Sequence, residues 1–79
     1  MHAYKGSTVP GQKTTKLGRI NARETAARQA TAERVAAEQL KKQARTKGAD
    51  AIVDFSVSFR STHAGQECIA SGVAVKFKR

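Results

Sequence analysis

The side chains of this sequence that could do chemistry are few and scattered. The soft-metal donors are His2, His63 and one cysteine, Cys68, with a carboxylate, Glu67, beside the cysteine. A metal site needs three or four ligands, and soft metals favour thiolate and imidazole. His63 and Cys68 could face each other across a loop, but two donors per chain are too few. We therefore predict no metal site, with His63 and Cys68 as weak candidates if subunits pool their ligands.

Patterns for catalysis or for nucleotide binding are not recognisable. No serine or cysteine stands in a nucleophile setting, and neither a P-loop pattern nor a GxGxxG pattern occurs. A flavin site would need stacking aromatic side chains, and the chain has no tryptophan. We therefore expect a protein that is not an enzyme, that holds no cofactor and that has no small-molecule substrate.

Positive charge is the strongest chemical feature of the chain. The net charge of +9 favours an anionic partner such as nucleic acid, a membrane surface or an acidic protein. Exposed stacking aromatics are not evident, so nucleic acid would be bound without reading its bases. Alternatively, the basic residues of the predicted helix are a solvated face that favours its own C-terminal dipole. The candidate residues for an anionic partner are Lys5, Lys13, Lys16, Arg19, Lys41, Lys42 and Arg45.

Composition and spacing predict the elements that position these residues. Residues 1–14 show no periodicity and are predicted to form a flexible basic arm, and residues 15–22 give a weak strand signal. Residues 23–47 lack proline and internal glycine, which is typical of a long helix. Gly48 is expected to end this helix in a left-handed conformation, and Asp50 to cap the following turn. The expected buried helix face is Ala26, Ala30, Ala37, Leu40 and Ala44.

Two segments after the helix alternate with a period of two, and a polar loop containing a glycine joins them. This pattern predicts an antiparallel β-hairpin from residues 51–59 and 68–77. The second strand has one face of large apolar residues and one of small residues. An approaching backbone or a second subunit could cover the small face, which we take as evidence for assembly through the sheet, the alternative being a face open to water. The large apolar face consists of Val53, Phe55, Val57 and Phe59 in the first strand and of Ile69, Val73, Val75 and Phe77 in the second. The small face of the second strand consists of Cys68, Ala70, Gly72 and Ala74.

The chain is short for a domain without a disulfide or a zinc ion. Its 79 residues offer mainly alanine and valine for a core, so self-association or docking into a larger protein complex is expected. No apolar run approaches the roughly 20 residues that cross a bilayer. The N-terminus also lacks the apolar stretch of a secretory signal. We therefore expect a cytoplasmic protein without a membrane span.

Two stretches resemble a known family. AAEQLKKQARTKGADAIVDFSVSF at residues 36–59 and ASGVAVKFKR at residues 70–79 resemble the YbjQ-like heavy-metal-binding domain family, with GADAIV and GVAVK as the specific part. LGRINA at residues 17–22 is similar to the first strand of the RcsF-like envelope lipoproteins, which are more distant relatives. The resemblance implies a dodecin-like βαββ unit that assembles into rings, of five subunits, and it implies no reaction. The paired cysteines of the lipoproteins are missing here, so their stress-sensor role does not transfer.

These observations predict an α+β fold in which a three-stranded antiparallel sheet packs on one long helix. The domain is expected at residues 15–79, preceded by the arm at residues 1–14. The expected function is a non-enzymatic assembly or binding module that self-associates or docks into a larger complex, while the basic arm engages an anionic partner. The alternative is a protein that binds nucleic acid nonspecifically.

Overall fold

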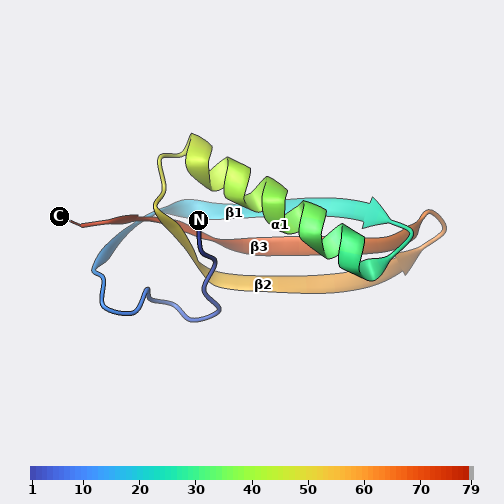
Figure 1. The fold of residues 1–79 in the computed structure, drawn as a ribbon, viewed down its shortest axis with the longest axis horizontal. Helices are drawn as coiled ribbons and strands as arrows, with labels where there is room; N and C mark the ends of the chain where they lie inside the picture. The colour runs from blue at the N-terminus through green and yellow to red at the C-terminus, as the bar shows by residue number, and fades with distance from the viewer. Residues whose placement is uncertain (79) are drawn as a thin grey trace.

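The computed structural model describes residues 1–78, which form a three-stranded sheet with one helix on it (Figure 1). The strands are antiparallel in the order β1-β3-β2, so that β3 lies in the centre. This arrangement confirms the predicted α+β fold of βαββ type. The elements are β1 (Thr14–Ala26), α1 (Gln29–Thr46), β2 (Ala51–Thr62) and β3 (Gly65–Phe77).

The boundary between β1 and α1 lies later than the composition predicts. The helix is expected from residue 23, whereas α1 begins at Gln29. Residues 23–26 instead continue β1 and pair with residues 66–69 of β3. Both strands are 13 residues long. Because β3 is as long as β1, the residues at the end of β1 gain backbone hydrogen bonds to β3. These hydrogen bonds outweigh the helix propensity of the alanines there.

The C-terminal end of α1 is as predicted. Gly48 has a φ of 79°, in the left-handed region that glycine enters without steric cost, and its N–H donates to the carbonyl of Arg45 at 2.9 Å. Asp50 then fastens the turn to β3 rather than capping it locally. Its N–H donates to the carbonyl of Val75, and its Oδ2 accepts from the N–H of Phe77, both at 2.8 Å.

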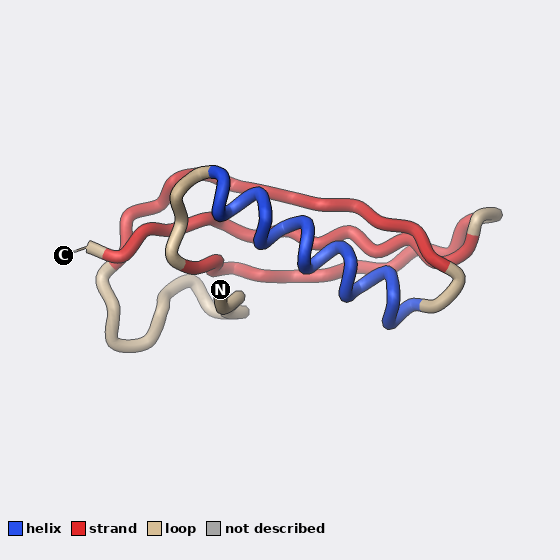
Figure 2. Tube along the Cα trace, turned by 45° about the horizontal axis from the view of Figure 1, so that its top comes forward, coloured by secondary structure: helices blue, strands red, loops and turns tan. Residues whose placement is uncertain are grey.

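The small-residue face of β3 lies beneath α1, which crosses one side of the sheet obliquely (Figure 2). This corrects the prediction that a second subunit covers Cys68, Ala70, Gly72 and Ala74, because the chain's own helix packs there. Small side chains on both surfaces allow the close approach. The buried helix residues are Ala32, Ala36, Leu40 and Ala44. Three of the predicted buried positions are not confirmed, because Ala26 belongs to β1, Ala30 is exposed and Ala37 is only half-buried.

A bulge in β2 moves its apolar residues to different faces. The pairing of β2 with β3 shifts between Val53 and Ser56, and Asp54 within the bulge has a φ of 53°. Ile52, Phe55 and Val57 consequently face α1, whereas Val53 packs on the opposite side of the sheet. The prediction that Val53 shares a face with Phe55 and Val57 is therefore wrong. A simple alternation rule cannot anticipate the extra residue.

The side of the sheet away from α1 carries a second apolar cluster, which the N-terminal segment covers. Val9 is only 5% exposed and packs with Ala51, Val53, Val73 and Val75. Residues 2–6 run parallel to the edge of β2. The N–H of Tyr4 donates to the carbonyl of Ile52 at 2.8 Å, and the N–H of Phe55 donates to the carbonyl of Tyr4 at 2.9 Å. The segment predicted as an arm thus has backbone partners in the domain, while its flexibility stays a prediction.

Replacement of Gly72 by alanine tests the close packing between β3 and β2. The added Cβ would lie 2.5 Å from Cγ2 of Ile52 and 3.2 Å from the carbonyl oxygen of Val53. Since Ile52 is fully buried, Gly72→Ala is expected to lower the free energy of unfolding by about 1–3 kcal/mol, measured by urea unfolding. Gly6→Ala is the matched control, because a Cβ there meets nothing within 4 Å. Equal stability of Gly72→Ala and the parent chain would contradict this packing.

Candidate functional site

Lysines from the two ends of the chain meet at one end of the sheet. The N–H of Lys78 donates to the carbonyl of Lys13 at 2.9 Å, and Lys76 pairs with Thr15 in the neighbouring position. Lys76 alternates with Phe77, which packs on the side away from α1, so Lys76 lies on the helix side. Sequence analysis missed Lys76 and Lys78. The signal that could have found them is the pairing of the first and last strands that a βαββ fold requires.

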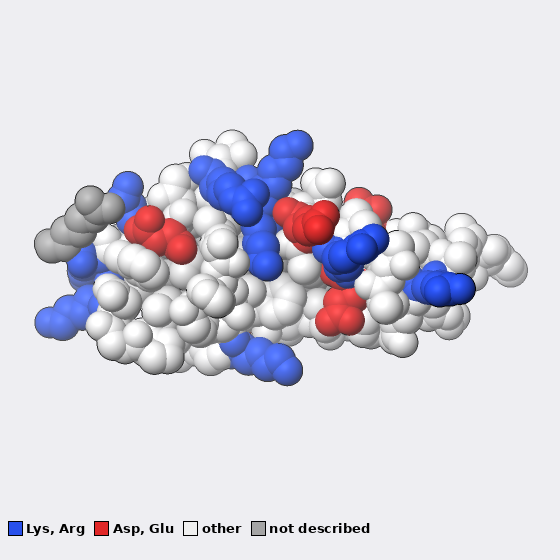
Figure 3. All heavy atoms as spheres, in the orientation of Figure 1, with Lys and Arg blue, Asp and Glu red and all other residues white. Residues whose placement is uncertain are grey.

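The last turn of α1 brings further cations to the same end of the sheet. The turn after α1 is tied to β3 through Asp50, which follows Lys47 by three residues. Figure 3 shows Lys and Arg side chains at this end of the molecule and over the surface of α1. We name this group the basic corner, and it consists of Lys13, Arg45, Lys47, Lys76 and Lys78.

The residues predicted for an anionic partner do not form one site. Three of them, Lys41, Lys42 and Arg45, line a shallow open depression on the exposed side of α1, together with Glu38 and Gln39. Lys16 and Arg19 lie elsewhere. They pair with Val75 and Val73 and so belong to the opposite side of the sheet, while Lys5 follows the edge of β2. The structure therefore joins Lys13 and Arg45 with Lys76 and Lys78, and it separates them from Lys16 and Arg19.

An apolar strip on β2 is left partly uncovered by α1. The helix packs mainly on β1 and β3, and Nε2 of Gln43 donates to the carbonyl of Asn21 on β1 at 2.7 Å. Phe55 and Val57 are consequently half-buried, and Phe59 is 36% exposed. We name Phe55, Val57 and Phe59 the β2 strip. It borders residues 56–62, whose outer backbone groups have no partner strand in the described chain.

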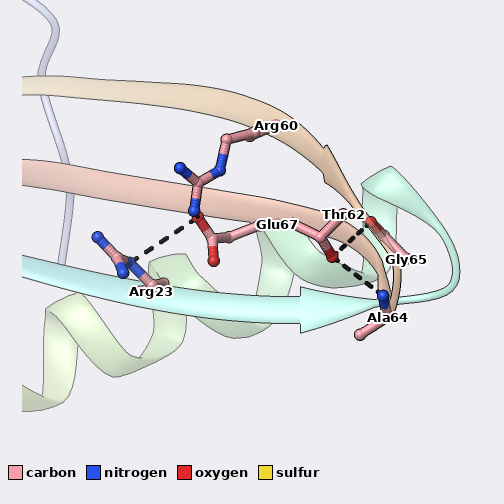
Figure 4. A network of polar contacts seen from close by, with 6 residues as sticks. All are labelled: Arg23, Arg60, Thr62, Ala64, Gly65 and Glu67. Carbon is pink, nitrogen blue, oxygen red and sulfur yellow. Dashed lines mark hydrogen bonds and ion pairs between the residues drawn. The ribbon is translucent and has the colours of Figure 1, made fainter.

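A buried carboxylate lies near the hairpin turn on the side away from α1 (Figure 4). Glu67 is 8% exposed, and its Oε1 lies 2.9 Å from Nη2 of Arg60 and 3.9 Å from Nε of Arg23. Neither contact has the geometry of a hydrogen bond, so the interactions of Oε1 with the two arginines are ion pairs. Thr62 closes the turn, since its Oγ1 accepts from the N–H of Ala64 at 3.2 Å. This network secures the cross-strand pairing of Arg60 with Glu67.

The soft-metal donors do not come together. Cys68 is fully buried beneath α1, whereas its neighbour Glu67 points to the other side of the sheet and His63 is exposed in the turn. Burial raises the pKa of the Cys68 thiol, and the negative charge of Glu33 adds to this. No cluster of three potential ligands occurs among the described residues. The donors that the structure describes in one chain therefore do not fit a heavy-metal site.

Comparison with known proteins identifies the family. The fold is similar to the crystal structure of a protein of unknown function of the DUF74 family from Pediococcus pentosaceus. The TM-score is 0.73 at 12% identity, over 96% of each chain. The model of the YbjQ family, described as "Putative heavy-metal-binding", matches residues 6–78, and the chain belongs to this family. No curated protein matches the sequence. No helix in residues 1–78 combines the length and apolar character needed to cross a membrane.

The reactivity of Cys68 tests whether this chain offers a metal ligand. Because Cys68 is buried and its pKa is raised, little thiolate is present at neutral pH. We expect the folded protein to react slowly with a disulfide reagent, to react rapidly once unfolded in urea, and to give no thiolate absorption with added Cd²⁺. Ala30→Cys, at an exposed position of α1, is the control and should supply one rapidly reacting thiol. A Cd²⁺–thiolate band from the folded parent chain would contradict the assignment.

Proposed function

We propose that this protein is a non-enzymatic assembly module that associates with further copies of itself through the edges of its sheet. The observation that carries the proposal is the β2 strip, which lies partly uncovered beside an open strand edge. Exposed apolar side chains next to unpaired backbone groups are what strand pairing between chains uses. In addition, we propose that the high positive net charge of the chain attracts an anionic partner.

The proposed contact joins the edge of β2 in one copy to the edge of β1 in the next. Both strands lie at the sides of the sheet, and the other large exposed apolar residue, Leu17, stands in β1. Such pairing would continue the sheet from copy to copy. Leu17 lies level with Ala51 and Ile52, whose edge residues 2–6 already cover, so Phe59 and Leu17 are covered together when the neighbouring strand is displaced along the edge or runs antiparallel to it. A contact between two different surfaces is heterologous, and it closes into a ring when the rotation per subunit permits.

The charges of the outer strands favour this contact over the pairing of two β1 edges. On the side away from α1, β1 carries Lys16, Arg19 and Arg23, so two copies of β1 would oppose like charges. The same side of β2 carries Ser56, Ser58 and Arg60, and Arg60 is paired with Glu67 of its own chain. A β2 edge with one neutralised arginine opposes the cations of β1 less strongly than a second β1 edge would.

Substitution of Phe59 or Leu17 by serine tests the proposed contact. Each is 36% exposed, so each change should leave the fold intact while removing apolar area from the interface. We expect the parent chain to be an oligomer by light scattering at low and high salt, and Phe59→Ser and Leu17→Ser each to shift it to the monomer. Arg34→Ala, on the exposed side of α1, is the control and should keep the oligomer. A monomeric parent chain would reject the proposal, and loss of a dimer with Phe59→Ser alone would indicate pairing of two β2 edges instead.

A further inference from the structure

The basic corner gathers cations that are far apart in the sequence onto a fixed frame. Lys13 precedes β1, Lys76 lies at the end of β3 and Lys78 follows it, while Arg45 lies in the last turn of α1 and Lys47 follows the helix. Backbone hydrogen bonds hold this frame, because Lys78 donates to Lys13 and the turn before β2 is bonded to β3. The positions of the cations are therefore set by the fold, and only their side chains are free to adjust.

This grouping places cations on neighbouring strands beside one another, where like charges repel each other. Arg45 and Lys47 have a structural role, since cations favour the C-terminal end of a helix. Lys13, Lys76 and Lys78 lie at the end of the sheet, and among the described residues none of them forms an ion pair. The nearby carboxylate of Asp50 accepts from the N–H of Phe77. Residues that cost stability and have no partner in the chain are typical of a binding site.

We propose that the basic corner binds the phosphate backbone of nucleic acid without reading its bases. The inference rests on the proposed function in one respect, namely that the net charge provides for an anionic partner. Backbone contact with phosphates needs only positive charges spaced along a surface, and lysine supplies these as mobile point charges. The bases would stay unread, because no aromatic side chain lines the depression on α1, and Phe77, between Lys76 and Lys78, packs on the opposite side of the sheet.

The shape of the charged surface favours nucleic acid over an acidic peptide. From Arg45 of the basic corner, the cations continue to Lys41 and Lys42 in the depression on α1, where they outnumber the single acid, Glu38. They thus form a track rather than a point, which suits a polymer with a charge on every unit. The five residues that line the depression are charged or polar, so it offers no apolar recess for the side chains of a bound peptide.

Two variants of equal net charge test the proposal on the full chain. In the first, Lys13, Lys76 and Lys78 are changed to glutamine, and in the control, the exposed residues Lys5, Arg28 and Arg34 are changed to glutamine. The probe is a fluorescein-labelled oligonucleotide of mixed sequence, whose affinity is measured over a range of salt concentrations. Each phosphate contact contributes about 0.9 to the slope of log affinity against log salt, so the first variant should lose about 2 to 3 of the slope and bind about 10- to 100-fold more weakly. The control should keep most of its slope.

Several outcomes would overturn the inference. An equal loss in both variants would show that net charge alone binds the probe, and the parent chain failing to bind at low salt would reject the site outright. Equal affinity for polyglutamate at the same charge concentration would assign the surface to an acidic protein, and tighter binding to vesicles of anionic lipid would assign it to a membrane. If the triple variant does not fold, Lys13→Gln and Lys78→Gln, each outside the strands, give the same test with a smaller change in slope.

The same samples separate this inference from the proposed assembly. Because the basic corner lies away from the β2 strip, the variant lacking Lys13, Lys76 and Lys78 should keep the oligomeric mass of the parent chain in light scattering. If Phe59→Ser, which keeps all three lysines of the basic corner, no longer bound the oligonucleotide, binding would require the assembled oligomer. Retained assembly without any binding by the parent chain would reject the basic corner and leave the assembly module standing.

Discussion

The close approach of α1 to β3 is the contact on which the rest of the structure depends. Four fully buried residues on the helix, three of them alanine, meet a row of Cys68, Ala70, Gly72 and Ala74 on the strand. With so little side-chain volume between them, the helix backbone lies near the sheet, and each contact buries little apolar area. The core is tight and thin as a consequence. The fit is closest at Gly72, where Ile52 occupies the space that a side chain would need.

A thin core on one side leaves the chain with apolar surface to cover elsewhere. The half of the outer sheet surface near the chain termini is closed by Val9, which the N-terminal segment brings across. The half near the hairpin is polar, with Oγ of Ser56 lying 3.0 Å from Oγ of Ser71 and with Glu67 held between two arginines. The β2 strip is the part that neither α1 nor the N-terminal segment covers fully, which is why the sheet edge carries the proposed assembly.

The elements could be predicted from the sequence because their signals are local. Gly48 ends the helix, and the alternation after residue 51 gives the hairpin. The faces could not be predicted in the same way. The bulge at Asp54 inserts one residue, so that Val53 lies on the side of the sheet away from α1. The helix packs on the small-residue face of β3 rather than on its large apolar face. Both outcomes depend on the distance between two packed layers, which a pattern along one strand does not contain.

The candidate site was predictable to a similar degree. The excess of positive charge is a property of composition, and the sequence located part of it in Lys13 and Arg45. Its grouping with Lys76 and Lys78 arises only when the first and last strands pair. The same pairing separates the metal donors, since Glu67 and Cys68 are neighbours in a strand and must point to opposite sides of the sheet. Strand alternation thus disperses the groups that a heavy metal would need, while strand pairing concentrates the groups that a polyanion would need. Among the described residues of this family member, the fold therefore groups positive charge and separates the potential metal donors.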